Sequence, residues 1–217
     1  RDGNLLGNPV CYRDGRTAGV PETVSKIIDP KAHYSTTGIQ VMEINTLSQL
    51  YSMKGSAQLE AADKLLFMPD LFGYFLTGVP GNEYCIASTS ELLDARARNW
   101  SWGTIRALGL PERIFGNIVM PGSVRGTLRS DIATETGLGN VKVVDVGSHD
   151  TASAVAALPA IEGDGPVAFL SSGTWSLLGV ELAEPLLTEE ARLAGFTNEG
   201  GVGGRIRFLQ NITGLWI

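Results

Sequence analysis

The 217-residue chain is predicted to have an α/β fold that contains parts of two domains. The first half of the chain consists mostly of segments with helix-like apolar spacing. A short β-branched run at 141–147 precedes the alanine-rich segment 152–158, which is the pattern of a strand followed by a helix. The glycine-rich stretch "IEGDGP" at 161–166 is typical of a hinge, so we divide the chain into residues 1–162 and 163–217.

The first-half elements are predicted from local signals. A short strand at Pro9–Tyr12 precedes a turn at Arg13–Gly15, because apolar residues are followed there by charged residues and glycine. The segment "MPDLFGYFLTG" has a proline suited to a first helical turn and a glycine, Gly78, after its last apolar residue. The segments with helix-like spacing are 18–28, 45–54, 68–77, 84–95 and 100–108, the last ending near Gly109.

The second half is predicted to contain most of the strands. "VKVVDVG" at 141–147 is an almost continuous apolar run, as expected of a strand that is buried on both faces. Two apolar runs flank a Ser-Gly-Thr turn within 167–182, which predicts a hairpin. "GRIRFLQN" at 204–211 alternates as a third strand would, and "NEGGVGG" at 198–204 is predicted to be a flexible loop.

The composition excludes several functional classes. With 43% hydrophobic and 18% charged residues, the chain has ample apolar residues for a core and too little charge for intrinsic disorder. A net charge of -6 without a basic stripe argues against nucleic acid as a partner. No apolar run is long enough to span a membrane, and no signal-like start is present. Only two cysteines occur, which favours a reducing, cytoplasmic location.

Residues with reactive side chains gather where the 141–147 strand is followed by a helix. Asp150 has two interpretations: a carboxylate that stabilises the helix N-terminus, or a general base that accepts a proton from a substrate hydroxyl. His149 is either a packed histidine or a group that orients a sugar hydroxyl. Ser148 and Thr151 are either caps or substrate contacts. The carboxyl end of a strand in an open α/β sheet is where ligands bind, which favours the functional interpretation.

The turn "SSGTW" at 171–175 also has two interpretations, an ordinary hairpin turn or a phosphate-binding loop. It lacks the Gly-Lys-Ser/Thr sequence and the following helix of a Walker motif. Other catalytic classes find little support, since no "GxSxG" hydrolase motif is present and two cysteines with two histidines do not favour a zinc site. Cys11 and Cys85 lie in apolar sequence and are predicted to be structural, without a disulfide.

Taken together, these motifs resemble the FGGY family of carbohydrate kinases along essentially the whole chain. "PVCYRDGRT" resembles the family's early strand and Asp/Arg turn, and "LLFMPDLFGYFLTG" and "EYCIASTSELLD" resemble two of its helical segments. "GSHDTASAV" is similar to the family's catalytic-base segment, and "LSSGTWSLLGVE" to its nucleotide phosphate loop. "FTNEGGVGGRIRFLQNITGLW" resembles the start of the second domain in members that act on L-rhamnulose.

The resemblance implies transfer of the γ-phosphoryl group of ATP to the 1-hydroxyl of L-rhamnulose, with Mg²⁺ as cofactor. It also implies an actin-like, ribonuclease H-like fold whose two α/β domains close around a central cleft. Residues 1–162 then belong to the N-terminal domain, and 163–217 begin the C-terminal domain. The residues that match the family's site are the catalytic base Asp150, the sugar contacts His149, Asp150, Thr151 and Asn211, and the nucleotide contacts Gly173 and Thr174.

The chain also departs from the family pattern. It has no counterpart of the N-terminal "DxG" phosphate loop or of the C-terminal part that binds adenine, and it begins at Arg1 rather than at a methionine. We therefore expect a segment of a longer protein, with little kinase activity alone, an exposed sheet edge and exposed apolar surface. Two alternatives stay open: a kinase for another ketose, such as L-fuculose or xylulose, and a non-catalytic actin-like sensor of sugar or nucleotide.

Overall fold

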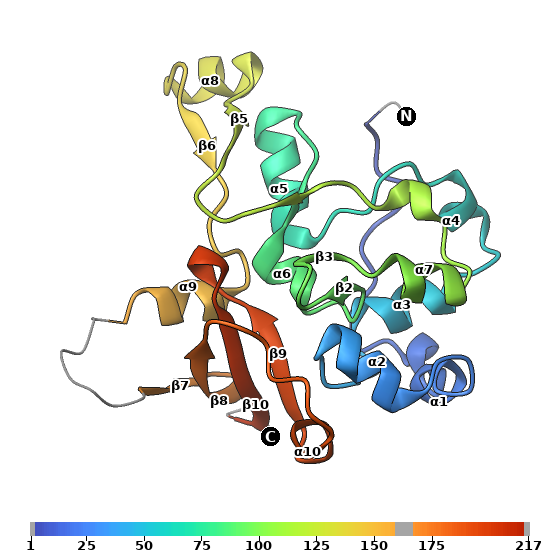
Figure 1. Ribbon diagram of the computed structural model, residues 1–217. Coiled ribbons are helices and arrows are strands. Elements are labelled where there is room, and N and C mark those ends of the chain that lie inside the picture. Colours follow the sequence, from blue (N-terminus) through green and yellow to red (C-terminus); the bar gives the residue numbers. More distant parts are fainter. Residues whose placement is uncertain (1–2, 159–166, 215–217) are drawn as a thin grey trace.

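The computed structural model describes residues 3–158 and 167–214, which form helices, two-stranded ladders and one larger sheet (Figure 1). The α-helices are α1 Val20–Val24, α2 Pro30–Thr37, α3 Thr46–Ser52, α4 Ala57–Ala61, α5 Met68–Thr77, α6 Tyr84–Ser88, α7 Trp102–Ala107, α8 Ser130–Thr136, α9 Asp150–Ala156 and α10 Glu189–Leu193. The strands are β1 Asn82–Glu83, β2 Leu93–Asp94, β3 Asn99–Trp100, β4 Ile118–Val119, β5 Val124–Thr127, β6 Lys142–Val144, β7 Ala168–Ser172, β8 Trp175–Leu182, β9 Phe196–Gly200 and β10 Ile206–Thr213. Short 3-10 helices are η1 Gly15–Thr17, η2 Glu112–Ile114 and η3 Val202–Gly204.

Helices α1, α3, α4, α6 and α7 pack around one apolar core on one side of the molecule (Figure 1). Leu47, Leu92 and Ile105 are almost completely buried there, together with the aromatic rings of Tyr84 and Trp100. Most of these helices are too short to be stable alone, so this shared burial holds them together.

Helix ends follow the signals in the sequence. Helix α5 contains Pro69 in its first turn and ends before Gly78, whose φ of 76° is a left-handed conformation that glycine adopts without strain. Helix α7 ends before Gly109, which has φ 63°. The helices predicted at 18–28 and 45–54 are present but shorter, as α1 and α3.

Two predictions for the first half were wrong. Residues Pro9–Tyr12 form no strand; they are exposed, and no described strand pairs with them. Only the turn is present there, closed by the amide of Asp14 donating to the carbonyl of Cys11. The helix predicted at 84–95 stops at Ser88, since Glu91 has a φ of 63°, which a right-handed helix does not allow, and β2 follows.

The second half forms a four-stranded antiparallel sheet in the order β7-β8-β10-β9. The predicted hairpin is present as β7 and β8, and the predicted third strand as β10. Residues 198–200 were wrongly predicted to be loop; they lie in β9 and are buried, because β9 pairs with β10 and packs against α6. Helix α9 covers the sheet through Val155, which packs with Phe169, Leu177 and Leu209.

The strand predicted to be buried on both faces is instead largely exposed. Strand β6 pairs antiparallel with β5, its only partner among the described strands, and this ladder lies beside α5 with α8 at its far end (Figure 1). Val144 and Val146 are 46% and 62% exposed, because no described element covers them. An exposed apolar surface is therefore present, as predicted. The hinge predicted at 161–166 lies outside the described residues.

The two cysteines differ in environment. Cys85 is buried, and burial raises the pKa of its thiol above the ordinary value, which makes it unreactive. Cys11 is exposed, so the prediction of an apolar environment was wrong for it, because its segment forms no strand. Both thiols are free, as predicted.

Within the described ranges, no helix is both long and apolar enough to cross a membrane.

The side chain of Asn198 in β9 joins the sheet to the helical half. It is buried, accepts from the amide of Leu186, and donates to the carbonyls of Leu186 and Gly38 and to the hydroxyl of Tyr34. The backbone of β9 adds two further bonds, from Asn198 to Gly38 and from Gly200 to the hydroxyl of Ser88. These bonds fix the sheet against α2 and α6.

A buried ion network anchors the chain ahead of α9. Arg125 on β5 donates to Asp70 on α5 and to Asp145 after β6, each at 2.6 Å. Burial raises the pKa of Asp70 to about 6, against the opposing effects of the Glu83 amide and Arg125, so this carboxyl stays ionised at pH 7. Removing one charge of such a network leaves the others buried and unpaired.

We predict that Arg125→Met in the full-length protein lowers the free energy of unfolding by about 3–5 kcal/mol. Urea unfolding followed by circular dichroism measures the change. Arg129→Met is the matched control, because Arg129 pairs with Asp131 at the surface and contributes little there. Equal midpoints for the two variants would contradict a stabilising role for the network.

Candidate functional site

The candidate site is the turn from Asp145 to Asp150, between β6 and α9 (Figure 1). Its first residue is held by Arg125 and by a bond from the Asp145 amide to the carbonyl of Ser123. Gly147 lies against η3, and an added Cβ there would come within 2.8 Å of Val202. Glycine is therefore required where the turn contacts the second half of the chain.

The carboxylate of Glu83 holds the middle of this turn. Glu83 is completely buried and accepts hydrogen bonds from the amides of Cys85 and Ile86, which begin α6. The same carboxylate accepts from the amide of Ser148, at 3.1 Å, and from the hydroxyl of Ser148. The amide of Glu83 in turn donates to Asp70, so the turn is connected to the Arg125 network.

Asp150 is the first residue of α9, and its side chain is 98% exposed. One carboxylate oxygen accepts from the amide of Thr151 at 2.7 Å, so Asp150 stabilises the helix start as the structural interpretation predicts. The exposed carboxylate also remains accessible to a ligand, as the functional interpretation requires. Both roles are compatible with this geometry.

His149 precedes Asp150 and contacts the second half of the chain. Its Nδ1 lies 3.4 Å from Nη1 of Arg207 on β10 and 3.6 Å from Oδ1 of Asp150. Arg207 is completely buried and pairs with Glu199 on β9 at 3.0 Å. Burial lowers the pKa of His149 below its ordinary value, which favours a neutral imidazole at pH 7.

The other predicted residues lie at different depths. Thr151 is buried beside Asp150, with its hydroxyl 3.4 Å from that carboxylate. Asn211 is partly buried on β10 and donates to Oε1 of Gln40, which again joins the two halves. Thr174 is exposed in the β7–β8 turn. The amide of the adjacent Gly173 donates to the carbonyl of Trp175, so it serves the hairpin itself.

The described residues can be compared with what a phosphate group and a metal ion require. The exposed Thr174 hydroxyl fits a phosphate oxygen, whereas the Gly173 amide is already engaged. Within residues 3–158 and 167–214, no group of three or more His, Cys, Asp or Glu side chains forms a metal site.

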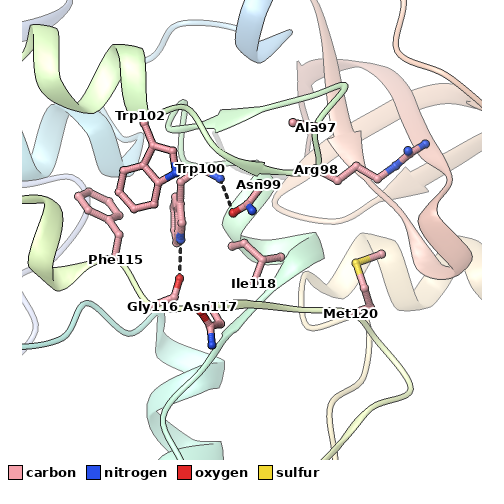
Figure 2. A pocket seen from close by; sticks show the side chains of 10 residues that line it. All are labelled: Ala97, Arg98, Asn99, Trp100, Trp102, Phe115, Gly116, Asn117, Ile118 and Met120. Atoms are coloured by element: carbon pink, nitrogen blue, oxygen red, sulfur yellow. Dashed lines mark hydrogen bonds between the residues drawn. The ribbon is translucent and has the colours of Figure 1, made fainter.

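A separate hollow of about 660 Å³ lies between the β2–β3 hairpin and β4 (Figure 2). Its wall includes Trp100, Trp102 and Phe115, and the indole N–H of Trp100 donates to the carbonyl of Gly116. A smaller hollow lies beside α1 and α2. Neither is lined by the predicted site residues.

Comparison with known proteins decides the family. The model of the N-terminal domain of the FGGY family of carbohydrate kinases matches residues 1–157. The chain belongs to the FGGY family of carbohydrate kinases. Similar FGGY relatives include a rhamnulokinase of Bacteroides thetaiotaomicron, 49% identical over all of this chain and 45% of the relative. A rhamnulokinase of Enterococcus faecalis is 40% identical over all of this chain and 43% of the relative. The chain thus spans about half the length of these relatives.

Solved structures confirm the predicted actin-like FGGY fold. A carbohydrate kinase from Novosphingobium aromaticivorans superposes with a TM-score of 0.79 at 27% identity, over 98% of this chain and 47% of that one. The Plasmodium falciparum glycerol kinase, solved with ADP, superposes with a TM-score of 0.80 over 98% of this chain and 43% of that one. At 13% identity, the second likeness shows the fold alone.

Three charged residues that contact the candidate site were missed by sequence reasoning. Glu83, Glu199 and Arg207 are charged residues within otherwise apolar or small-residue segments, and all three are buried. Burial of a charge requires a partner, and the partners lie between 8 and 65 positions away in the sequence. The one signal that the sequence offers for Arg207 is its position next to Ile206 in a strand whose side chains alternate between two faces.

We predict that Glu83→Gln loosens the turn ahead of α9. An amide nitrogen cannot accept the bonds that the carboxylate receives, which leaves buried donors unsatisfied at a cost of about 1–3 kcal/mol. Hydrogen exchange of the amides at 146–150 in the full-length protein should accelerate. Glu22→Gln, an exposed carboxylate in α1, is the control. Unchanged protection in Glu83→Gln would show that Ser148 is held by other contacts.

Proposed function

We propose that the protein containing this segment is an ATP-dependent sugar kinase that phosphorylates the 1-hydroxyl of L-rhamnulose. The observation that carries the proposal is the turn at 147–151, where an exposed carboxylate and a histidine stand at a helix start in an FGGY kinase domain. Relatives named rhamnulokinase, 40% and 49% identical along the whole segment, support this substrate. We also propose a cytoplasmic location.

We assign the role of general base to Asp150. Its carboxylate accepts the proton of the sugar hydroxyl as that oxygen forms a bond to the γ-phosphorus of ATP and the bond to ADP breaks. The surrounding contacts support this role because they hold the backbone of the turn while leaving the carboxylate exposed. Positioning of this kind supplies most of the catalysis in phosphoryl transfer.

The remaining predicted residues are assigned to binding. His149, Thr151 and Asn211 are proposed to contact the sugar. Thr174 is proposed to contact the nucleotide, and Gly173, whose amide is engaged in the hairpin, to let the nucleotide approach the backbone closely, because the space beside its Cα is open. ATP supplies the phosphoryl group, and Mg²⁺ neutralises its charge. We place the end of the N-terminal domain at 162 and the start of the C-terminal domain at 163.

We predict that Asp150→Asn in the full-length protein lowers kcat by about 10²- to 10⁴-fold, because an amide cannot accept the proton. Sugar and ATP affinities should change little, as calorimetry can show. Asp131→Asn, an exposed aspartate also in the first turn of a helix, should retain full activity. A non-catalytic sensor would have no ketose-dependent ADP release to lose, and Asp150→Asn activity equal to wild type would exclude the base role.

We predict that the full-length protein prefers L-rhamnulose over L-fuculose and D-xylulose by about tenfold or more in kcat/KM, since one unmatched hydroxyl leaves a polar group of the site unpaired. Initial rates of ADP release with each ketose measure this preference. The 217-residue segment assayed in parallel should release no ketose-dependent ADP. A higher kcat/KM for another ketose would reassign the substrate without changing the reaction.

A further inference from the structure

Arg207 is a permanently charged side chain with no exposed surface, held from three directions. Its Nε donates to the carbonyl of Gly200 at 3.0 Å, and its Nη2 lies 3.0 Å from the carboxylate of Glu199. Glu199 faces it directly in the register of β9 and β10. The remaining nitrogen, Nη1, is 3.4 Å from Nδ1 of His149. All three guanidinium nitrogens therefore have a defined neighbour.

The contact with His149 has a chemical consequence. A guanidinium only donates hydrogen bonds, so Nδ1 of His149 must accept with its lone pair. A proton on Nδ1 would place two N–H groups against each other at this separation. The neutral imidazole therefore carries its proton on Nε2, and no described residue accepts a hydrogen bond from that nitrogen. About a fifth of the His149 side chain, 22%, remains exposed.

Asp150 makes the choice of tautomer important. Its Oδ1 lies 3.6 Å from the same Nδ1, so a proton on Nδ1 would donate to the proposed base. Such a bond stabilises the carboxylate and makes Asp150 a weaker acceptor of the substrate proton. Because Nδ1 of His149 accepts from Arg207, it carries no proton that it could donate to Asp150 in place of the substrate hydroxyl.

The charges around His149 act in both directions. Burial lowers its pKa most, and Arg207 lowers it further, whereas Glu199, Asp150 and Glu83 raise it. Loss of the guanidinium would leave the three carboxylates that raise the pKa of His149 without the charge of Arg207 to oppose them. Arg207 thus also opposes protonation of His149.

We propose that Arg207 is a positioning residue that fixes the Nε2-protonated tautomer of His149, which then offers an N–H donor to a hydroxyl of the bound sugar. The role of the donor rests on the proposed function, whereas the tautomer does not. Because Arg207 lies in the part predicted to begin the second domain and His149 in the part matched by the N-terminal domain, the contact also links the two.

The tautomer is measured directly by nitrogen NMR of the full-length protein labelled with ¹⁵N-histidine, at pH 7.5 and without ligands. Signals of His149 are identified by their loss in His149→Gln. The proposal expects a protonated Nε2 and an unprotonated Nδ1. A protonated Nδ1, or an imidazolium at this pH, would overturn it. This measurement requires no substitution at Arg207 and no kinase activity.

Variants then test whether Arg207 is the cause. In Arg207→Met the pKa of His149 should rise, because a cation beside the ring is lost, or the proton should move to Nδ1, and kcat/KM for the ketose should fall more steeply between pH 8 and pH 6 than in wild type. Arg207→Lys, which retains a donor and the charge, should restore the Nε2 tautomer. Arg205→Met removes an exposed arginine two residues away and should match wild type.

Each outcome separates the inference from the proposed function. If Arg207→Met does not fold, Glu199→Gln tests the same geometry. This substitution removes the charge that holds Arg207, so the contact between Arg207 and His149 should loosen and the nitrogen signals of His149 should broaden or shift. An unchanged tautomer and pH profile in folded Arg207→Met would overturn the proposal. An Nε2-protonated His149 in a protein without ketose-dependent ADP release would refute the kinase proposal and leave the Arg207 assignment standing.

Discussion

The buried carboxylate of Glu83 joins two segments that are 65 positions apart, the start of α6 and the turn ahead of α9. A completely buried charge is stable only when its hydrogen-bonding capacity is satisfied, and here four donors satisfy it. The amide of Glu83 extends the connection to Asp70 and so to Arg125 and Asp145. The turn at 145–150 is thus held at its first residue and at Ser148, while Asp150 remains exposed.

A second set of buried charges holds the turn from the other side. Arg207 and Glu199 come from the four-stranded sheet, and Gly147 permits the close approach of η3. The candidate base therefore stands where the helical half and the sheet meet. Asn198 and Gln40 add bonds across the same junction.

The sequence predicted what depends on local signals. Pro69, Gly78 and Gly109 mark real helix ends, and the Ser-Gly-Thr turn separates two real strands, because these features depend on backbone preference alone. The strand at Pro9–Tyr12 and the burial of β6 were predicted wrongly, because both depend on neighbouring strands that a local pattern does not reveal. Residues 198–200 were predicted to be loop because glycines follow Asn198 and Glu199. They form a strand because they pair with β10 and pack on α6.

The candidate residues of the site could be chosen from the sequence, but the buried charges that contact them could not. His149 and Asp150 were identified by their place between a strand and a helix, whereas the buried charges that hold them come from distant segments. Whether Asp150 is the base is decided most directly by a crystal structure of the full-length protein with ketose and a non-hydrolysable ATP analogue. The account predicts a carboxylate oxygen of Asp150 about 2.6–3.2 Å from the sugar 1-hydroxyl. A ketose bound elsewhere, such as between Trp100 and Trp102, would contradict it.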